Sequence, residues 1–265
     1  MIVSSCFGRW PLSLAIAAAC VIGTAGAAGA QTSGPQPRIG QDLPESDFLF
    51  KRPRGLVSVR GAWLMPSENS DLFEFVQDQL TIESGDFNSP SFAMDIGYSL
   101  TPRLDIVGGF DVAKQSVDSE YRDLVDNNHL PIEQQSTLRQ NAFTGSVRFA
   151  LVPRGRAVGR YAWVPTRVQP YVGAGGGMVF WEFKQVGDFV DFQDQEVFTD
   201  VFTSSGASLS GHVLGGIDVQ IYKQLFLTTE GRYVWASGEL NNEFVGFEPI
   251  DLSGFRLSAG INFVF

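Results

Sequence analysis

Cysteine and histidine are scarce in this chain. Its two cysteines, Cys6 and Cys20, lie within the first 30 residues, and its two histidines are His129 and His212. We expect the first 30 residues to be removed, so the mature chain would have no disulfide, no thiolate metal site and no cysteine nucleophile. Only these two histidines could supply an imidazole group for catalysis or metal binding.

Positive charge and long apolar runs are also lacking. Arg9 is the only charged residue among the first 30, and without it 18 basic residues face 29 acidic ones, a net formal charge of −11. This balance argues against nucleic acid as a partner. No apolar run after residue 30 approaches the length of a membrane helix. A membrane protein made from the remainder must therefore be a closed barrel, because hydrocarbon cannot satisfy an open sheet edge.

The first 30 residues have the organisation of a secretory signal peptide. The apolar stretch from Pro11 to Ile22 follows Arg9, and Ala28-Gly29-Ala30 before Gln31 gives a small-x-small cleavage site. The alternatives are a buried helix or a membrane anchor, and a lipoprotein signal at Cys20 is disfavoured because the apolar run continues past it. Residues 31–53, rich in Gly, Pro, Gln and charge, are predicted to be a short periplasmic N-terminal segment.

From residue 54 to residue 265, segments of alternating polarity recur between turn residues. Such alternation indicates strands with one apolar and one polar face. The segments lie at about 57–63, 92–100, 104–112, 143–151, 168–181, 212–221, 225–235 and 255–265. The fifth has no clear facing because of its glycines, Gly173 and Gly175 to Gly177. Eight strands of this length predict an all-β fold, an eight-stranded antiparallel up-and-down transmembrane barrel.

The last strand ends in Phe265 and alternates strictly, with apolar residues at every second position from Phe255. It resembles the final strand of bacterial outer-membrane β-barrels, and residues 54–265 resemble the OmpA-like and OmpW-like small barrels. This resemblance implies location in the outer membrane, and it implies that Phe265 is a signal to the barrel assembly machinery. A soluble, lipocalin-like barrel is the alternative. It is disfavoured by charges at mid-strand and by aromatic residues near strand ends, as in interfacial girdles, namely Trp63, Tyr98, Trp181, Tyr233 and Trp235.

The predicted loops alternate in length, and the long ones are acidic. The spans 67–90, 115–138, 182–207 and 239–252 hold six, five, six and four acids, together 21 of the 29. Outer-membrane barrels place their long loops outside, so we expect an acidic extracellular face. Solvated loops are the simple explanation, and collection of divalent cations is the sharper one. No Asp-x-Asp-x-Asp-Gly loop is present, so no metal site is named.

The polar face of the strands carries nine charges that should point into the lumen. They are Arg60, Asp95, Asp105, Asp111, Arg148, Asp218, Glu230, Arg232 and Arg256. The interior of an eight-stranded barrel is only wide enough for side chains to fill it, and unpaired buried charges are costly. We therefore expect an interlocked polar core without a wide pore. The alternative is a narrow or gated conduit.

One long loop contains a helical pattern. Apolar residues recur with helical spacing from Asp71 to Leu80, and Asp71 with Glu74 resembles a capping box. This predicts a short amphipathic helix that lies on the rim or caps the lumen mouth. Packing of the same residues against other loops is the alternative, and Phe198 to Phe202 could join them.

The resemblance specifies architecture better than activity. Some small barrels act on lipid A and carry a His-x-Ser pattern, but Leu130-Pro131 follows His129 and Val213-Leu214 follows His212. We therefore expect no enzymatic activity, no catalytic residue and no cofactor. The leading hypothesis is a barrel that contributes to envelope integrity or surface interaction through acidic loops. A narrow porin-like channel for small solutes comes second, and a lipid A-modifying enzyme third. Expected partners are outer-membrane lipids and lipopolysaccharide.

Overall fold

The computed structural model describes residues 49–125, 129–191 and 196–265. The predicted signal peptide, most of the predicted N-terminal segment, and two of the loop acids, Asp126 and Asp194, lie outside these residues. All of the predicted strand segments fall within them.

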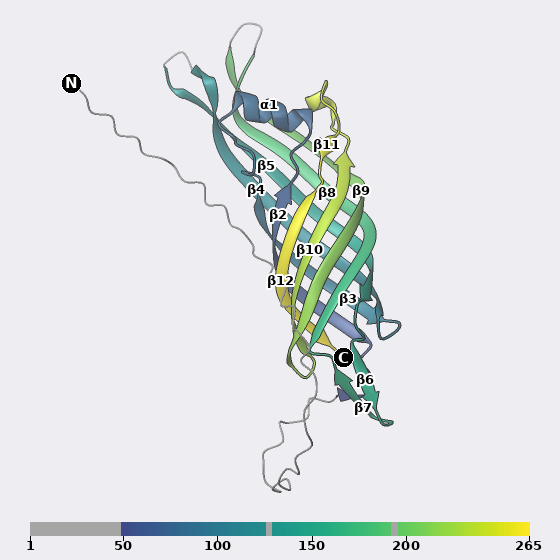
Figure 1. Ribbon diagram of the computed structural model, residues 1–265. Coiled ribbons are helices and arrows are strands. Elements are labelled where there is room, and N and C mark those ends of the chain that lie inside the picture. Colours follow the sequence, from purple (N-terminus) through teal and green to yellow (C-terminus); the bar gives the residue numbers. More distant parts are fainter. Residues whose placement is uncertain (1–48, 126–128, 192–195) are drawn as a thin grey trace, which may run out of the picture. The chain divides into compact units, whose positions relative to one another are not determined.

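Eight antiparallel strands close into a ring. They are β2 (Gly55–Pro66), β3 (Ser89–Ser99), β4 (Leu104–Val125), β5 (Pro131–Ala150), β8 (Val168–Val190), β9 (Val197–Tyr222), β10 (Leu225–Gly238) and β12 (Gly254–Val264). Each pairs with the next, and β12 pairs with β2, so that Val264 lies opposite Leu56 and Gly254 opposite Pro66. The predicted eight-stranded antiparallel barrel is confirmed (Figure 1).

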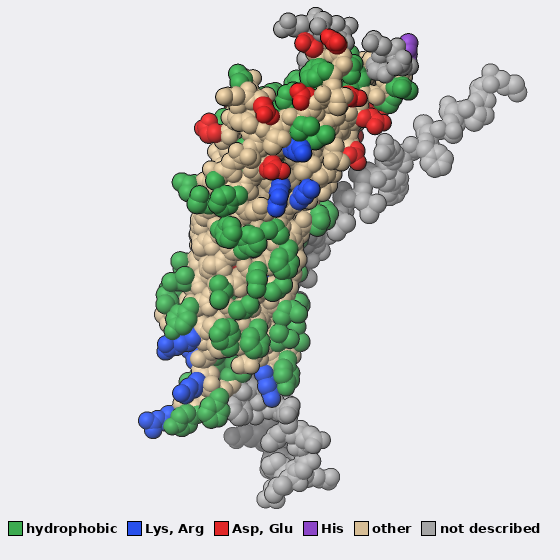
Figure 2. Space-filling view, turned by 180° about the vertical axis from the view of Figure 1, so that it is seen from behind, with side chains coloured by type: hydrophobic (Ala, Val, Ile, Leu, Met, Phe, Trp, Pro, Cys, Tyr) green, Lys and Arg blue, Asp and Glu red, His purple; other side chains and the backbone are tan. Residues whose placement is uncertain are grey.

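The apolar face of the wall points outward. Ile96 is 65% exposed and Ile261 49%, whereas their inward neighbours Asp95 and Asn262 are each 2% exposed. Figure 2 shows apolar side chains, in green, over the part of the wall in view. We call this outward surface the apolar band. A lipocalin-like barrel would have the opposite facing, because its apolar residues line the interior.

The aromatic residues near strand ends do not all join this band. Trp63, Tyr98 and Trp235 are about half exposed, as predicted for interfacial positions. Trp181 is 3% exposed and donates a hydrogen bond from Nε1 to Ser208 Oγ inside the barrel, 3.1 Å away. Its assignment to a girdle was therefore wrong. It lies in the glycine-rich strand, whose facing the sequence left open.

Two of the predicted long loops are mostly strand. β4 and β5 continue to Val125 and from Pro131, and β8 and β9 continue to Val190 and from Val197. These four adjacent strands form a tall side of the barrel, where short connections join β4 to β5 and β8 to β9. The prediction of loops at 115–138 and 182–207 was wrong because the outward residues there are polar. The hydrophobic alternation is lost although the strands continue.

The other two long connections fold over this tall side. The connection from β2 to β3 contains helix α1 (Asp71–Gln79), and that from β10 to β12 contains the 3-10 turn η1 (Asn242–Phe244) and β11 (Ile250–Asp251). We call the end of the barrel that carries α1 the cap end. The helix is as predicted, but the capping box was wrong: Ser70 is the N-cap, and the Asp71 carboxylate accepts a hydrogen bond from the Glu248 N–H. In the described residues no helix is long and apolar enough to cross a membrane.

A small sheet lies at the opposite end. β6 (Gly155–Val158) and β7 (Ala162–Pro165) form a hairpin, and β7 also pairs with β1 (Leu49–Phe50). This hairpin lies between the predicted strand segments 143–151 and 168–181, where the sequence has four arginines and no apolar-polar alternation. We call this end the hairpin end (Figure 1).

The glycines of β8 allow close strand packing, which gives a first test. A Cβ added at Gly175 would lie 2.0 Å from the Gly145 carbonyl oxygen and 2.8 Å from His212 Nε2, whereas one at Gly61 meets nothing within 4 Å. Gly175→Ala should lower the free energy of unfolding by about 1–3 kcal/mol through overpacking, and Gly61→Ala should lower it by clearly less. Urea unfolding in lipid vesicles measures both, and equal losses would contradict this account.

Candidate functional site

The inner face of the wall gathers all nine charges that the alternation predicted. Each is at most 6% exposed. They come from seven of the eight strands, because the strand period of two keeps every one of them on the lumen side. The strands thus bring together side chains that are up to 196 positions apart, as with Arg60 and Arg256.

Glu230 is at the centre of the network. Its two carboxylate oxygens lie 2.7 Å from Arg60 Nη1, 3.1 Å from Arg148 Nη2 and 2.9 Å from Arg232 Nη2. Asp95 joins the same arginines from the other side, with Oδ2 at 2.6 Å from Arg60 Nη2 and 2.9 Å from Arg148 Nη2. Four strands on opposite sides of the lumen are therefore joined by charge-assisted hydrogen bonds.

The network continues to a third carboxylate. Arg232 Nη1 lies 3.3 Å from Asp111 Oδ2, and Arg256 Nη1 lies 2.9 Å from Asp111 Oδ1. Four arginines and three carboxylates, Asp95, Asp111 and Glu230, make up this connected cluster, which therefore has a net positive charge.

The nine predicted charges comprise four arginines and five carboxylates, and a tenth residue, Arg154, balances them. Arg154 precedes β6 and lies outside the predicted strand segments. It points back into the hairpin end of the barrel, where it forms ion pairs with Asp105 and Asp218, Nη1 lying 3.0 Å from Asp218 Oδ2. With Arg154 the interior holds five arginines and five carboxylates. Its presence was signalled only by the charge imbalance of the nine predicted residues.

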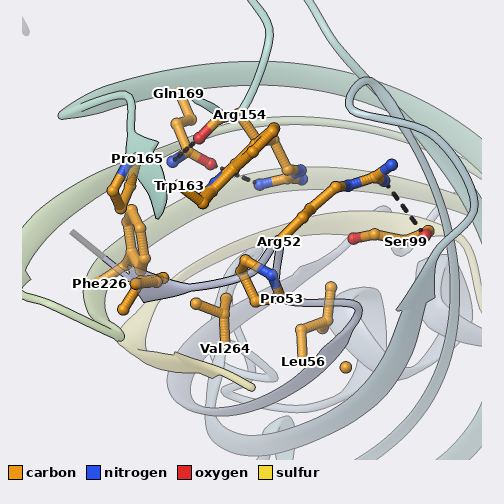
Figure 3. Close-up of a pocket in the computed structure, with 12 residues that line it drawn as sticks. Arg52, Pro53, Leu56, Ser99, Arg154, Trp163, Pro165, Gln169, Phe226 and Val264 are labelled. Carbon is orange, nitrogen blue, oxygen red and sulfur yellow. Dashed lines mark hydrogen bonds between the residues drawn. The ribbon is translucent and has the colours of Figure 1, made fainter. Parts of the chain in front are cut away.

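Arg154 is also part of the closure at this end. Its Nη1 donates a hydrogen bond to Gln169 Oε1 (2.9 Å), and Trp163 from β7 lies beside it (Figure 3). Leu49 and Trp163 are each 7% exposed. A cavity of about 30 Å³ remains among these side chains, which is room for about one water. The small sheet thus fills the mouth of the lumen.

Tyr171 lies between the two charge clusters, and the apolar-polar alternation does not identify it as a lumen residue. Its hydroxyl donates a hydrogen bond to Glu230 Oε2 at 3.0 Å. The guanidinium carbons of Arg148 and Arg154 lie 5.2 and 6.0 Å from its ring centroid. Gly216 makes room for this ring, because a Cβ there would lie 2.5 Å from the Tyr171 hydroxyl. The glycines of β9 opposite β8 were the feature of the sequence that could have indicated an aromatic side chain pointing into the lumen.

The two histidines lie in different surroundings. His129 is exposed, with a positive φ of 63°. His212 is 2% exposed, and its Nε2 lies 2.8 Å from Ser146 Oγ. Its Nδ1 has no hydrogen-bond partner in the described part of the chain, so a carboxylate that would orient the ring as in a catalytic triad is not in place. The arrangement is that of a structural hydrogen bond within the lumen.

At the cap end the lumen filling changes from charged to apolar. Leu72, Phe73 and Val76 of α1 are at most 1% exposed, and they pack in one cluster with Trp181 and Phe183 of β8. The other members are Leu80, Ile82, Phe87, Leu138, Ala142, Val179, Ala236, Phe244, Ile250 and Leu252. Phe202 packs against this cluster, whereas Phe198 contacts Phe189. α1 therefore caps the mouth, and we call this cluster the cap core.

The start of the cap contains one buried carboxylate. Glu68 is 7% exposed and has a positive φ of 53°. Burial raises the pKa of its carboxyl above the usual range, although the Gly85 N–H and the Gln77 side chain donate hydrogen bonds to it. Its role is to fix the loop that precedes α1.

Acidic side chains gather at the cap end, where Figure 2 shows them in red. Among the described residues no group of three or more His, Cys, Asp or Glu side chains could hold a metal ion. Phe265, the predicted assembly signal, exchanges backbone hydrogen bonds with Gly55 and is 56% exposed. Its recognition by an assembly machinery stays a prediction.

Comparisons with known proteins give a likeness in fold only. No protein-family model matches the chain, and no curated protein matches it. Among solved structures, Neisserial surface protein A is 16% identical (TM-score 0.45; 80% of this chain, 97% of that chain). The outer membrane protein OprG from Pseudomonas aeruginosa is 13% identical (TM-score 0.45; 82% and 97%). The attachment invasion locus protein Ail of Yersinia pestis is 14% identical (TM-score 0.37; 79% and 99%).

Identities and scores of this size say nothing about function, and the fold is established by the strand pairing. The apolar outer surface, the charged interior and the closed ring together make this chain a barrel of the small outer-membrane type in its architecture.

Proposed function

We propose that this chain is an integral outer-membrane barrel with a closed interior, which strengthens the envelope and presents an acidic surface to the outside. The apolar band is the surface that a bilayer would cover. The cap end, with its long connections, would face the exterior, and the hairpin end the periplasm. In this proposal the barrel inserts with the help of the assembly machinery, and lipids and lipopolysaccharide surround it.

Three layers of side chains in the lumen support the proposal that the interior is closed. The cap core fills one end, the connected cluster of seven charges crosses the middle, and Trp163 with Arg154 and its two carboxylate partners fills the other end. The interior of an eight-stranded barrel is one that side chains can fill, whereas the larger barrels of porins leave an aqueous channel. This supports a structural or surface role over the porin-like alternative. An enzymatic role has no supporting geometry at either histidine.

Planar-bilayer recording tests the closed interior. The purified barrel should give no stable single-channel steps, because paired charges fill the middle of the lumen and the cap core fills one end. The variant Arg60→Ala/Arg148→Ala should introduce small steps, since it removes two side chains that cross the lumen. Large, stable steps from the unmodified protein would contradict the proposal and favour the channel.

The envelope role is tested in a deletion strain. Loss of the protein should raise the uptake of a hydrophobic dye, and the unmodified gene should restore the barrier. A variant with four exposed acids at the cap end neutralised (Glu74→Gln/Asp78→Asn/Glu120→Gln/Glu133→Gln) separates the surface role from the barrel itself. Arg156→Gln/Arg160→Gln at the hairpin end is the matched control. No change of uptake on deletion would contradict an envelope role.

A further inference from the structure

Two basic residues face each other on the outside of the wall, just above the apolar band towards the cap end. Lys114 on β4 is paired with Arg139 on β5, and both side chains are exposed. No described carboxylate lies within ion-pair distance of either. Like charges on directly opposite residues destabilise a sheet. The Lys114–Arg139 pair therefore destabilises the sheet locally, and an anion bound between the two side chains would reduce their repulsion.

The surrounding charges leave the pair positive. Glu182 on β8 is opposite Arg139, and Lys184 follows two residues later. Asp118, two outward positions beyond Lys114, accepts a hydrogen bond from Gln135 at 2.7 Å. Arg122 is engaged with the carbonyl oxygens of Gln77 and Ile82. Three cations thus face one carboxylate at this level, and Figure 2 shows blue side chains between the green band and the red tip.

The position of the pair is set by the end of the apolar band. The outward residues before it on the two strands are Val112 and Phe110 on β4, and Asn141 and Phe143 on β5. The rings of Phe110 and Phe143 lie 4.7 Å apart. A hollow of about 780 Å³ spans this boundary, lined by Pro90, Phe92, Val112, Lys114, Arg139 and Asn141. The surface of the hollow is apolar on the side of the apolar band and positively charged on the side of the cap end.

We propose that this hollow binds a phosphorylated lipid of the outer leaflet, with its phosphate between Lys114 and Arg139 and an acyl chain along Val112 and Phe110. The inference rests on the proposed membrane location. Charge complementarity selects the phosphate: lysine and arginine donate charge-assisted hydrogen bonds to phosphate oxygens. The adjoining apolar floor selects a lipid over a free anion, because it lies where the hydrocarbon of a bilayer begins.

The experiment is a native mass-spectrometry titration of the detergent-purified full chain with diphosphoryl lipid A. The unmodified protein should bind one lipid with about tenfold higher affinity than Lys114→Gln/Arg139→Gln, a loss of the size expected for charge-assisted contacts. The hairpin-end variant Arg156→Gln/Arg160→Gln is the matched control and should bind as the unmodified protein does. Dephosphorylated lipid A should bind as weakly to the unmodified protein as diphosphoryl lipid A binds to the double variant.

Two further measurements keep the outcomes separate. Competition by excess inorganic phosphate should leave lipid binding nearly unchanged, and complete displacement would overturn the lipid in favour of a free-anion site. Equal binding by the unmodified protein and the double variant would overturn the site. Insertion into vesicles, read by protection from protease, is measured for each variant. Failure to insert would contradict the membrane location, whereas insertion without lipid selection would overturn this inference alone.

Discussion

Glu230→Gln is expected to lower the free energy of unfolding by about 3–5 kcal/mol, the usual cost of removing one partner from a buried ion pair. Glu230 is 2% exposed and contacts three arginines, Arg60, Arg148 and Arg232. Those guanidinium groups would be left with two carboxylates in a cluster that is already one positive charge in excess. Reversible urea unfolding in lipid vesicles measures the loss.

A matched control separates burial from the change of side chain. Glu120 on β4 is exposed, and Glu120→Gln should change the free energy of unfolding by less than about 0.5 kcal/mol, as for other exposed substitutions. Comparable losses for the two variants would show that the network adds little to stability. A double variant Glu230→Gln/Arg232→Gln, which removes one charge of each sign, should recover part of the loss because it restores the original net charge.

Phe73→Ala is the second large expected effect, a loss of about 3–5 kcal/mol from a cavity in the cap core. Phe73 is 0% exposed, and its ring makes edge contacts with Phe87 and Phe183, at centroid distances of 5.4 and 6.1 Å. The damage should concentrate in the cap. Hydrogen exchange should therefore become faster in α1 and in the connection that follows it, and should change little in β12.

Phe75 provides the comparison on the same helix. It is 40% exposed and contacts Phe247, so Phe75→Ala should cost clearly less and should leave exchange in α1 closer to that of the unmodified protein. If Phe73→Ala accelerated exchange uniformly over the barrel, the cap would be an inseparable part of the wall. If it had no effect on α1, the cap core would not hold the helix.

The alternating pattern allowed the wall to be predicted in detail. The side-chain period of a strand is local, so Arg60, Asp95 and Glu230 could be assigned to the inner face without knowledge of their partners. The same pattern told which face is apolar. It failed at Trp181 and Tyr171, because neighbouring glycines removed the apolar-polar contrast on which facing is assigned.

The sequence could not predict which side chains pair with one another across the lumen. Arg154 follows a proline in a segment without alternation, and only the fold of the β6–β7 hairpin returns its side chain to Asp105 and Asp218. The cap is similar: the helical spacing from Asp71 predicted a helix, but its location depended on apolar residues of β5 and β8 that lie more than 60 positions away.

The sequence by itself determined the eight-stranded wall, the outward apolar face and nine of the ten charges that pair inside the lumen, because all three follow from local alternation. The tertiary structure decided that β4, β5, β8 and β9 rise beyond the apolar band, that α1 fills the mouth they form, and that Arg154 completes the charge balance. These features depend on contacts between residues distant in the chain, which no local pattern encodes.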